Sequence, residues 1–537
     1  MRSKVFGVQN CVVEFSLSSS REYRDPLNEV ELDVLCVEPD GTERRVPAFW
    51  AGGREWRVRY ASPTKGAHQC RTICSDTSNA SLHNKECTIE ITEYQGQNPL
   101  LLHGPIRVVD NHHFEHWDGT PFFWLGDTWW MGLSKRLGWP EEFQLLVADR
   151  VARGFTVIQI VAGLYPDMPP FDPRGENEAG WPWDKEFRRI NPSYFDMADR
   201  RIHWLVRAGL APCIVGCWGY YIDFAGVEAM KKHWRYLVAR YGAYPVIWCM
   251  AGEATMLYYL SPARENREKR EQAMAAARAG WTEVTRYSRS INSYGHPITL
   301  HPSQTARETV DDPSVMDFDM LQTGHNGWRS MPNTVRLIHE SRGATPKMPT
   351  VVGEVCYEGI MGGSWEDVQR FAFWASMLSG AVGYTYGANG IWQLNRPDDP
   401  FGNSPHGTSW GGPDWQEAWR LPGSQQVALG KELLERYEFW KFEPHPEWVE
   451  PHATKEDYYQ PYAAGIPGTV RVIYIPPTWS RVAVAGLEGG RDYRAYYFNP
   501  RNAEEVDLGD VHGDSSGRWA APPAPIRQDW VLVIESK

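Results

Sequence analysis

Two glutamates stand where a pair of carboxylates could act on one bond. Glu354 ends the short apolar run PTVVGE at 349–354, and Glu253 ends the run VIWCMAGE at 246–253. A protonated carboxyl group can supply a proton to a leaving oxygen while an ionised one attacks the adjacent carbon, which is the arrangement that cleaves glycosidic bonds. The two glutamates are therefore the predicted catalytic residues.

Each glutamate alone has a plainer interpretation, because acidic side chains are mostly solvated. A structural ion pair is the alternative for the two together. Glu358 lies four positions beyond Glu354 but past the end of the apolar run, in a predicted loop, so Glu354 is the preferred nucleophile.

The segments that must position these residues repeat a pattern of short apolar run, polar loop and amphipathic stretch. Continuous apolar runs are typical of parallel strands that are buried on both faces. The predicted strands are 121–127, 155–163, 210–219, 246–253, 297–302, 318–325, 349–354 and 381–387. The predicted helices are 141–153, 192–208, 227–241, 262–290, 333–341, 364–380, with Ser364 as N-cap, and 425–440. Eight such units predict a (β/α)₈ TIM barrel, with the chemistry at the carboxyl ends of its strands.

Further polar and aromatic residues lie just beyond these predicted strands, at the expected barrel mouth. The predicted substrate-binding residues are Asp127, Trp218, Tyr220, His301, His325, Tyr357, Tyr386, Asn389 and Trp392. Asp127 could instead cap its own loop, and the two histidines are more typical of hydrogen-bonded supports than of acid–base groups. The long Gly- and Pro-rich segment 387–423 is expected to fold over the mouth, with Trp392, Trp410 and Trp415 as candidates for stacking on a sugar.

Alternating apolar and polar residues flank the barrel on both sides and predict antiparallel sheets. The expected organisation is an N-terminal β-sandwich at 1–106, the barrel at 107–443 and a small C-terminal β-sandwich at 444–537. Either flanking domain could bind carbohydrate or only shield the barrel.

Composition narrows the functional classes. A net charge of −12 without a long basic run argues against nucleic-acid binding, and an aromatic content of 13 % suits a protein that stacks on sugar rings. No membrane span or signal peptide is recognised, so a cytoplasmic location is expected. The nine cysteines are interpreted as small buried thiols, and His112, His113 and His116 as loop residues, so neither a metal nor a cofactor is expected. The oligomeric state stays open.

Several of these segments resemble a known family. The segments HHFEHWDGTPFFWLGDTWW, RGFTVIQ, WCMAGE, VVGE and GYTYGANGIWQ are together similar to the apiosidase-like glycoside hydrolases of family 140. Residues 26–62 are more loosely similar to the β-sandwich that often precedes such barrels, and the family often carries a collagen-binding-type C-terminal domain. The resemblance implies a barrel glycosidase with catalytic carboxylates after strands four and seven, here Glu253 and Glu354. The family pattern has an aspartate where this chain has Glu253, so the resemblance does not assign apiose as the sugar.

The resulting hypothesis is a retaining glycoside hydrolase in which Glu354 attacks and Glu253 is the acid and then the base. Its substrate would be a glycoside or a plant or microbial oligosaccharide, with pentofuranosides such as apiosides or arabinofuranosides among the candidates. The alternatives are an inverting hydrolase that uses Asp127 and a non-catalytic carbohydrate-binding or scaffold protein. The sugar, anomer, linkage and exo or endo action stay open.

Overall fold

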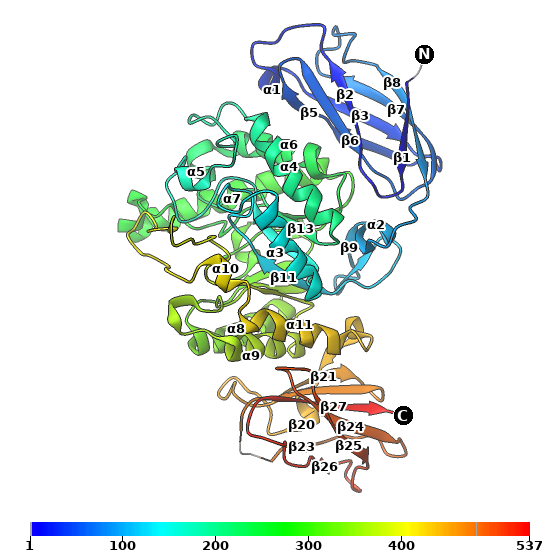
Figure 1. Cartoon of the computed structure of the whole chain (residues 1–537), viewed down its shortest axis with the longest axis vertical. Coiled ribbons are helices and arrows are strands. Elements are labelled where there is room, and N and C mark those ends of the chain that lie inside the picture. The colour runs from blue at the N-terminus through cyan, green and yellow to red at the C-terminus, as the bar shows by residue number, and fades with distance from the viewer. Residues whose placement is uncertain (1–2, 479–480) are drawn as a thin grey trace.

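The computed structural model describes residues 3–478 and 481–537, so the first two residues of the predicted N-terminal domain lie outside the described residues. Figure 1 shows three parts along the long axis, with a β-rich N-terminal part, a central α/β part and a β-rich C-terminal part. The helices labelled α8, α9 and α11 lie between the barrel strands and the C-terminal sheets.

The N-terminal part consists of two mainly antiparallel sheets that pack around a common core. One sheet has the strand order β1 (Ser3–Val8), β8 (Glu86–Thr92), β7 (Gly66–Cys74), β3 (Leu32–Val37) and β4 (Glu43–Pro47), in which β1 and β8 run parallel. The other has the order β2 (Val13–Ser18), β6 (Glu55–Tyr60) and β5 (Phe49–Gly52). Burial alternates along β7, as expected for a strand with one face in the core and one in water. The predicted sandwich architecture of this part is confirmed.

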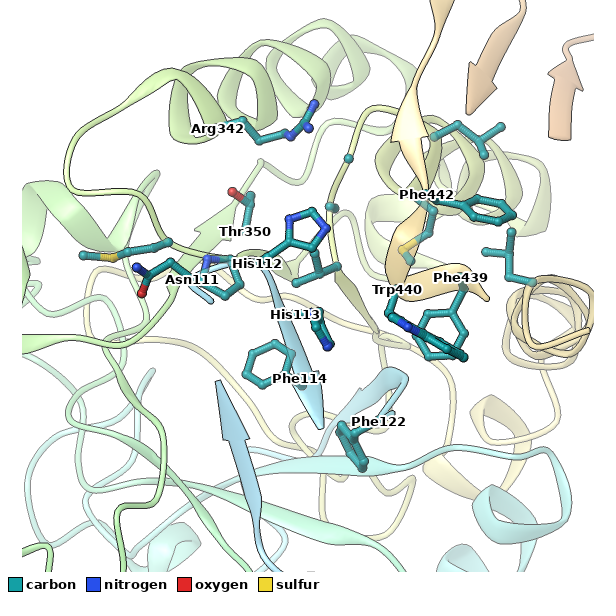
Figure 2. Close-up of a pocket in the computed structure, with 18 residues that line it drawn as sticks. Asn111, His112, His113, Phe114, Phe122, Arg342, Thr350, Phe439, Trp440 and Phe442 are labelled. Carbon is teal, nitrogen blue, oxygen red and sulfur yellow. The ribbon is translucent and has the colours of Figure 1, made fainter. Parts of the chain in front are cut away.

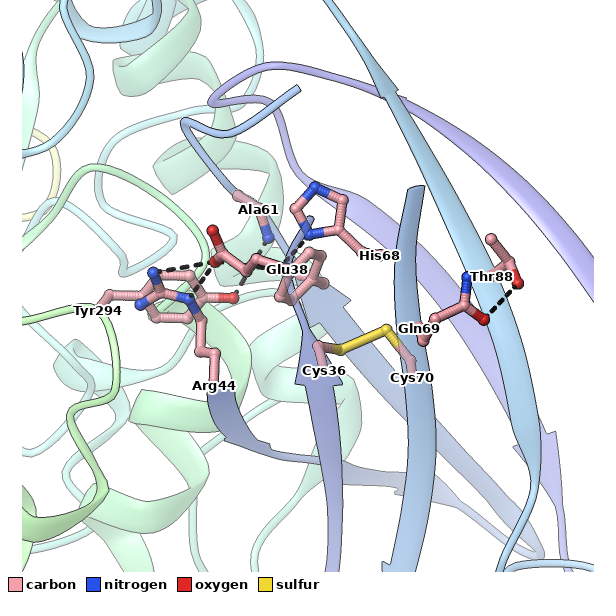
Figure 3. The surroundings of a disulfide bond; sticks show 10 residues. Cys36, Glu38, Arg44, Ala61, His68, Gln69, Cys70, Thr88 and Tyr294 are labelled. Atoms are coloured by element: carbon pink, nitrogen blue, oxygen red, sulfur yellow. Dashed lines mark hydrogen bonds and ion pairs between the residues drawn. A yellow bond between two sulfur atoms is a disulfide. The ribbon is translucent and has the colours of Figure 1, made fainter. Parts of the chain in front are cut away.

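The prediction that all cysteines are free thiols is wrong. Figure 3 shows a disulfide between Cys36 of β3 and Cys70 of β7. The two residues face each other directly in the register of these neighbouring strands, which brings the sulfur atoms together. The other seven cysteines are free.

The central sheet contains eight parallel strands in the order β15-β14-β13-β12-β11-β18-β17-β16. Their bounds are β11 (Trp124–Thr128), β12 (Val157–Val161), β13 (Ala211–Val215), β14 (Ile247–Cys249), β15 (Ile298–Thr299), β16 (Asp319–Gln322), β17 (Thr350–Glu354) and β18 (Gly383–Tyr386). Each falls within a predicted strand, except that β11 extends one residue further, to Thr128, and every one of these residues is buried. The predicted TIM barrel is confirmed, although β15 and β16 do not pair directly with each other.

The barrel helices lie close to their predicted positions. They are α3 (Glu141–Ala152), α4 (Pro192–Arg207), α6 (Val227–Tyr241), α7 (Arg267–Ile291), α8 (Met331–Gly343), α9 (Glu366–Leu378) and α11 (Pro422–Leu434), which ends before the predicted 440. Short helices are α1 (Pro26–Glu29) in the N-terminal part, α2 (Pro99–Leu102) before the barrel, and α5 (Tyr221–Ala225) and α10 (Trp415–Ala418) in barrel loops. The long charged helix begins later than predicted because Asn266 caps it, accepting a hydrogen bond from the Lys269 amide. Ser364 is not the N-cap of α9, since that position falls on Trp365.

Before the barrel, a hairpin of β9 (Ile106–Val109) and β10 (His113–His116) covers its amino-terminal side. His113 and His116, predicted as loop residues, belong to β10. Beyond the barrel, one sheet has the order β19 (Glu443–Pro444), β21 (Tyr462–Ile466), β22 (Val470–Ile475), β27 (Trp530–Ser536), β24 (Tyr493–Phe498) and β25 (Glu505–Val511). The second has the order β20 (Val449–Glu450), β23 (Ala483–Val484) and β26 (Trp519–Ala520).

Arginine side chains join both flanking parts to the barrel. Arg370 of α9 donates to Asp529 at 2.6 Å, and both side chains are almost fully buried. On the other side, Arg59 of β6 donates to the carbonyl oxygen of Arg240 in α6 at 2.7 Å. Figure 3 shows a further contact, in which Arg44 of β4 lies against the Tyr294 ring after α7. The flanking sheets are thus packed onto the barrel helices.

Candidate active site

A cavity opens at the carboxyl ends of the barrel strands. Its lining residues are Trp130, Pro166, Asp167, Trp218, Glu253, Met256, Tyr259, Arg264, Gln322, His325, Glu354, Tyr357, Ile360, Trp392, His406 and Trp410. Both predicted catalytic glutamates lie in it, together with a third carboxylate, Asp167. Among the residues that the structure describes, no group of His, Cys, Asp and Glu side chains is arranged to hold a metal ion.

Glu354 is the last residue of β17 and is 4 % exposed. Its neighbour Gly353 allows β16 to approach closely, because a Cβ atom there would lie 2.4 Å from the Met320 side chain. The register of β16 against β17 shifts between Leu321 and Gln322, so that Gln322 pairs with Glu354. This irregularity brings the Gln322 amide beside the carboxylate.

Two histidines hold the Glu354 carboxylate. His325 Nε2 lies 2.8 Å from Oε1 and His301 Nε2 lies 3.1 Å from Oε2, both as ion-pair contacts. Burial alone would raise the pKa of Glu354, but the two histidines outweigh it and lower that pKa to about 2. Burial disfavours the charged form of His325, but the neighbouring Glu354 favours it more strongly. The pKa of His325 is therefore raised. Glu354 is therefore ionised at neutral pH.

Glu253 follows β14 and has a left-handed backbone conformation, with a φ of 38°. This conformation is rare for a residue with a side chain and is often found at functional sites. The Met256 amide donates to its carbonyl oxygen at 2.7 Å. Gly219 permits the close approach of the neighbouring loop, because a Cβ atom there would lie 2.5 Å from the same carbonyl oxygen.

The environment of Glu253 favours its protonated form. Burial and then the negative charge of Glu354 raise its pKa to about 7. Among the described residues, the Glu253 carboxyl group has only two hydrogen-bond donors, both at long distances: Trp218 Nε1 at 3.3 Å from Oε2 and Gln322 Nε2 at 3.4 Å from Oε1. The two glutamates thus have pKa values shifted in opposite directions, as an acid and a nucleophile require.

Gln322 joins the two carboxylates. Its Nε2 atom lies 3.4 Å from Glu253 Oε1 and 3.3 Å from Glu354 Oε1, so these two oxygens can be at most 6.7 Å apart, the sum of the two distances. Carboxyl groups about 5–5.5 Å apart are typical of retaining glycosidases, and about 6.5–9.5 Å of inverting ones. The limit admits the retaining separation and excludes all but the lowest part of the inverting range.

Stacked aromatic rings form one wall of the cavity. The Tyr357 ring lies between the His325 ring, at 5.2 Å and 14°, and the Trp392 ring, at 5.8 Å and 22°. The Tyr357 hydroxyl accepts a hydrogen bond from Trp130 Nε1 at 2.9 Å. A flat aromatic wall of this kind suits the apolar face of a sugar ring.

Most of the predicted site residues come together here. Glu253, Glu354, Trp218, His325, Tyr357 and Trp392 line the cavity, and His301 lies behind Glu354. Trp410 also lines it, as expected for the segment predicted to fold over the mouth, whereas Trp415 is fully buried in the core.

Four predicted substrate-binding residues lie elsewhere. Asp127 is fully buried and accepts from Arg150 Nε at 2.6 Å and Trp129 Nε1 at 2.7 Å, so its carboxylate does not face the cavity. The Tyr386 hydroxyl donates to Glu358, and the Tyr220 hydroxyl donates to a main-chain oxygen at 3.0 Å.

Asn389 is the fourth predicted substrate-binding residue that lies outside the cavity. Its amide oxygen accepts from Trp392 Nε1 at 3.1 Å, and its amide nitrogen donates to the Trp410 carbonyl oxygen at 3.1 Å. These four side chains support the mouth from behind and do not line it.

Several other residues that line the cavity were not predicted from the sequence. Gln322 precedes His325 in the same predicted strand, and its place at the strand end was the signal for it. Asp167, Tyr259 and His406 lie in loops well beyond strand ends, where position along the chain carries no such signal.

A second pocket lies at the opposite end of the barrel. Figure 2 shows it between the β9–β10 hairpin, the start of β17 at Thr350 and the segment from Phe439 to Phe442. Its lining contains aromatic rings, His112, His113 and Arg342, but no aspartate or glutamate. It therefore lacks the carboxylate pair that the chemistry needs.

Two regions of the chain are similar to known protein families. Residues 109–441 match the model of the apiosidase-like catalytic domain, and residues 9–75 match a domain of unknown function, DUF5060. No curated protein matches the chain.

Solved structures show the same fold. A glycoside hydrolase is similar with a TM-score of 0.67 and 22 % identity, over 82 % of this chain and 98 % of its own. A family 5 glycoside hydrolase from Bacteroides vulgatus ATCC 8482 has a TM-score of 0.66 and 22 % identity, over 82 % of this chain and 94 % of its own. A third structure, from the same organism, covers all of both chains with a TM-score of 0.69 and 15 % identity.

Proposed function

The chain belongs to the apiosidase-like family of glycoside hydrolases, and from that premise we propose that it hydrolyses its glycoside with retention of configuration, using Glu354 and Glu253. In the first step a Glu354 oxygen attacks the anomeric carbon, the bond from that carbon to the leaving oxygen breaks, and Glu253 gives its proton to this oxygen. The glycosyl ester on Glu354 is the intermediate.

In the second step the roles of Glu253 reverse. Now ionised, it takes a proton from a water molecule, whose oxygen attacks the anomeric carbon and releases Glu354. The products are the free sugar and the alcohol, and both carboxyl groups return to their starting protonation states.

The observation that carries this proposal is the bridge of Gln322 between two carboxylates with opposite pKa shifts. One group is held ionised and the other protonated, and the limit of 6.7 Å between their Oε1 atoms admits the separation that is typical of retention. An inverting reaction through Asp127 has no such support, because that carboxylate is enclosed with Arg150. A protein that only binds carbohydrate would have no need of two buried carboxyl groups with opposite pKa shifts.

The substrate is an O-glycoside, and aryl furanosides and pyranosides of pentoses and hexoses form the panel with which to find its sugar. For a substrate from this panel that is cleaved, proton NMR of the first-formed product decides the stereochemistry. We expect the product to have the anomeric configuration of the substrate. A product of opposite configuration would overturn the retaining mechanism.

A further inference from the structure

Asp167 is a buried carboxylate in the catalytic cavity that the two-step reaction does not use. It lies in the loop after β12, is 8 % exposed, and has a left-handed backbone conformation with a φ of 56°. It shares the cavity with Glu253 and Glu354. A third carboxylate near the other two raises the electrostatic free energy of the cavity.

Among the described residues no arginine or lysine forms an ion pair with Asp167, although the exposed Arg264 lines the same cavity. Five aspartates are buried among the described residues, namely Asp33, Asp127, Asp167, Asp319 and Asp529. Four of them form ion pairs with arginine: Asp33 with Arg45 and Arg235, Asp127 with Arg150, Asp319 with Arg307 and Asp529 with Arg370. Asp167 has no such pair within residues 3–478 and 481–537.

Neutral groups hold Asp167 in place instead. Ser404 Oγ and Trp410 Nε1 donate to its Oδ1 atom, the indole at 3.0 Å. The Asp167 amide donates to the Tyr259 hydroxyl at 3.1 Å. These partners come from the loops after β14 and β18, so three loops meet at this carboxylate. The contacts fix its position in the cavity without neutralising its charge.

We propose that Asp167 is a specificity-determining residue that accepts hydrogen bonds from neighbouring hydroxyl groups of a neutral sugar bound in the catalytic cavity. A carboxylate has acceptor capacity for two hydroxyls, and hydrogen bonds to a charged group are the strong ones. A site built to bond a hydroxyl discriminates against sugars that lack it. An acidic sugar would meet the carboxylates of Glu354 and Asp167, while Arg264, the arginine of the lining, is exposed to solvent. This assignment rests on the proposed function of the same site.

The competing role is structural, as a latch that holds the segment 387–423 through Ser404 and Trp410. Asp167→Asn keeps an oxygen acceptor and the shape of the side chain but removes the charge. Ser404→Ala is the matched control, since it removes one latch contact and keeps the charge. Both variants should fold, because neither changes the volume of the core.

The test combines these variants with paired substrates, an aryl glycoside of the preferred sugar and its mono-deoxy analogues. For the hydroxyl that Asp167 binds, deoxygenation should lower kcat/KM of the wild type about 10- to 100-fold, and Asp167→Asn should lower it by a similar factor. The two changes together should cost little more than either alone. Ser404→Ala should lower kcat/KM by the same small factor for every sugar.

Additive losses at every deoxy position would overturn the assignment, as would a uronide being the best substrate. The pH profile gives a second readout that a latch would not move. After burial and Glu354, the charge of Asp167 is among the causes that raise the pKa of Glu253. Asp167→Asn should therefore shift the alkaline limb of kcat/KM to lower pH, and an unshifted limb would contradict the proposal.

The proposed function and this assignment fail separately. A wild type that inverts configuration would end the retaining mechanism, while a retaining wild type indifferent to Asp167→Asn would end only the role of Asp167. Calorimetry with free D-xylose, L-arabinose, D-mannose and D-galactose extends the test to binding alone. At least one of these sugars should bind the wild type, and it should bind the Asp167→Asn variant at least about 10-fold more weakly. Equal affinity of the two proteins would overturn the assignment, as would a wild type that neither binds nor hydrolyses any of the sugars.

Discussion

Glu253 and Glu354 have the same side chain and opposite surroundings. Glu354 is held by His301 and His325, whereas Glu253 meets only an indole and an amide donor at longer distances. The charge of Glu354 itself helps to keep Glu253 protonated, so the role of each residue depends on the other. Residue identity alone could not have distinguished the acid from the nucleophile.

The first prediction concerns the leaving group. Glu253→Gln cannot donate a proton, so kcat/KM should fall about 100- to 10,000-fold for glycosides of alkyl alcohols. Dinitrophenyl glycosides need no protonation of the leaving oxygen, so their loss in the first step should be small. Steady-state kinetics over a series of leaving groups checks this. Equal losses across the series would show that Glu253 is not the acid.

The second prediction concerns pH. The first step needs Glu253 protonated, so kcat/KM should fall as pH rises through its pKa of about 7. It also needs Glu354 ionised, and that condition holds down to low pH because the pKa of Glu354 is lowered. In Glu354→Gln the opposing charge is gone, and the pKa of Glu253, followed by carboxyl carbon NMR, should fall. A pKa that stays near 7 would mean that burial alone raises it.

At the scale of elements, loop geometry determines whether the catalytic side chains meet. Gly219 lies directly against the Glu253 carbonyl oxygen and the Ala254 main chain, and no side chain fits between them. The register shift in β16 has the same effect for Gln322 and Glu354. Both features position a carboxylate through the main chain of a neighbouring segment.

The third prediction tests this packing. A methyl group in Gly219→Ala would press against main-chain atoms at 2.5 and 2.6 Å and displace Glu253. The free energy of unfolding should fall by about 1–3 kcal/mol, and kcat should fall about 100-fold because small misplacements of catalytic groups are costly. Gly343→Ala is the control, since nothing lies near a Cβ atom there. Thermal unfolding and kinetics measure both, and equal behaviour of the two variants would contradict the prediction.

Strand positions could be predicted because parallel barrel strands are continuous apolar runs, as in 349–354, and the residue after each run faces the mouth. Asp127 also follows such a run, but its carboxylate is buried against Arg150 and does not face the cavity. Arg150 lies on the following helix, so only the folded structure shows that the two side chains meet. The disulfide depended in the same way on the register that sets Cys36 opposite Cys70. Asp167 was missed because its loop, not its strand, places it in the cavity.

At the scale of the whole molecule, the flanking β-rich parts are attached to the barrel through its helices, away from the catalytic cavity. Aromatic stacking accompanies the buried ion pair on the C-terminal side, where the Trp374 and Tyr474 rings are 6.2 Å apart and 9° from parallel. Such contacts between helix and sheet make the C-terminal part a support for α9, which packs next to β18.

The fourth prediction concerns this junction. Arg370→Leu would remove the buried cation beside Asp529, leaving the exposed Arg501 and the Tyr474 hydroxyl as its neighbours, and should destabilise the protein by about 3–5 kcal/mol. Arg494→Leu removes an exposed arginine from the same part of the chain and is the control. Thermal unfolding should show a lowered Tm only for Arg370→Leu. The KM of the folded enzyme should stay at its wild-type value, and a changed KM would indicate that the junction reaches the cavity.

The barrel wall has a seam where β15 and β16 meet without a ladder of main-chain hydrogen bonds. His301 follows one of these strands and Gln322 ends the other, so two groups that hold the carboxylates stand on either side of it. The His301 and Gln322 amides donate to the Ala251 and Gln304 carbonyl oxygens, and local opening of these bonds determines how fast each amide exchanges its hydrogen with solvent. A sugar bound between the carboxylates would draw both sides of the seam together, and slower amide exchange at His301 and Gln322 would report occupancy of the cavity without any chemical step.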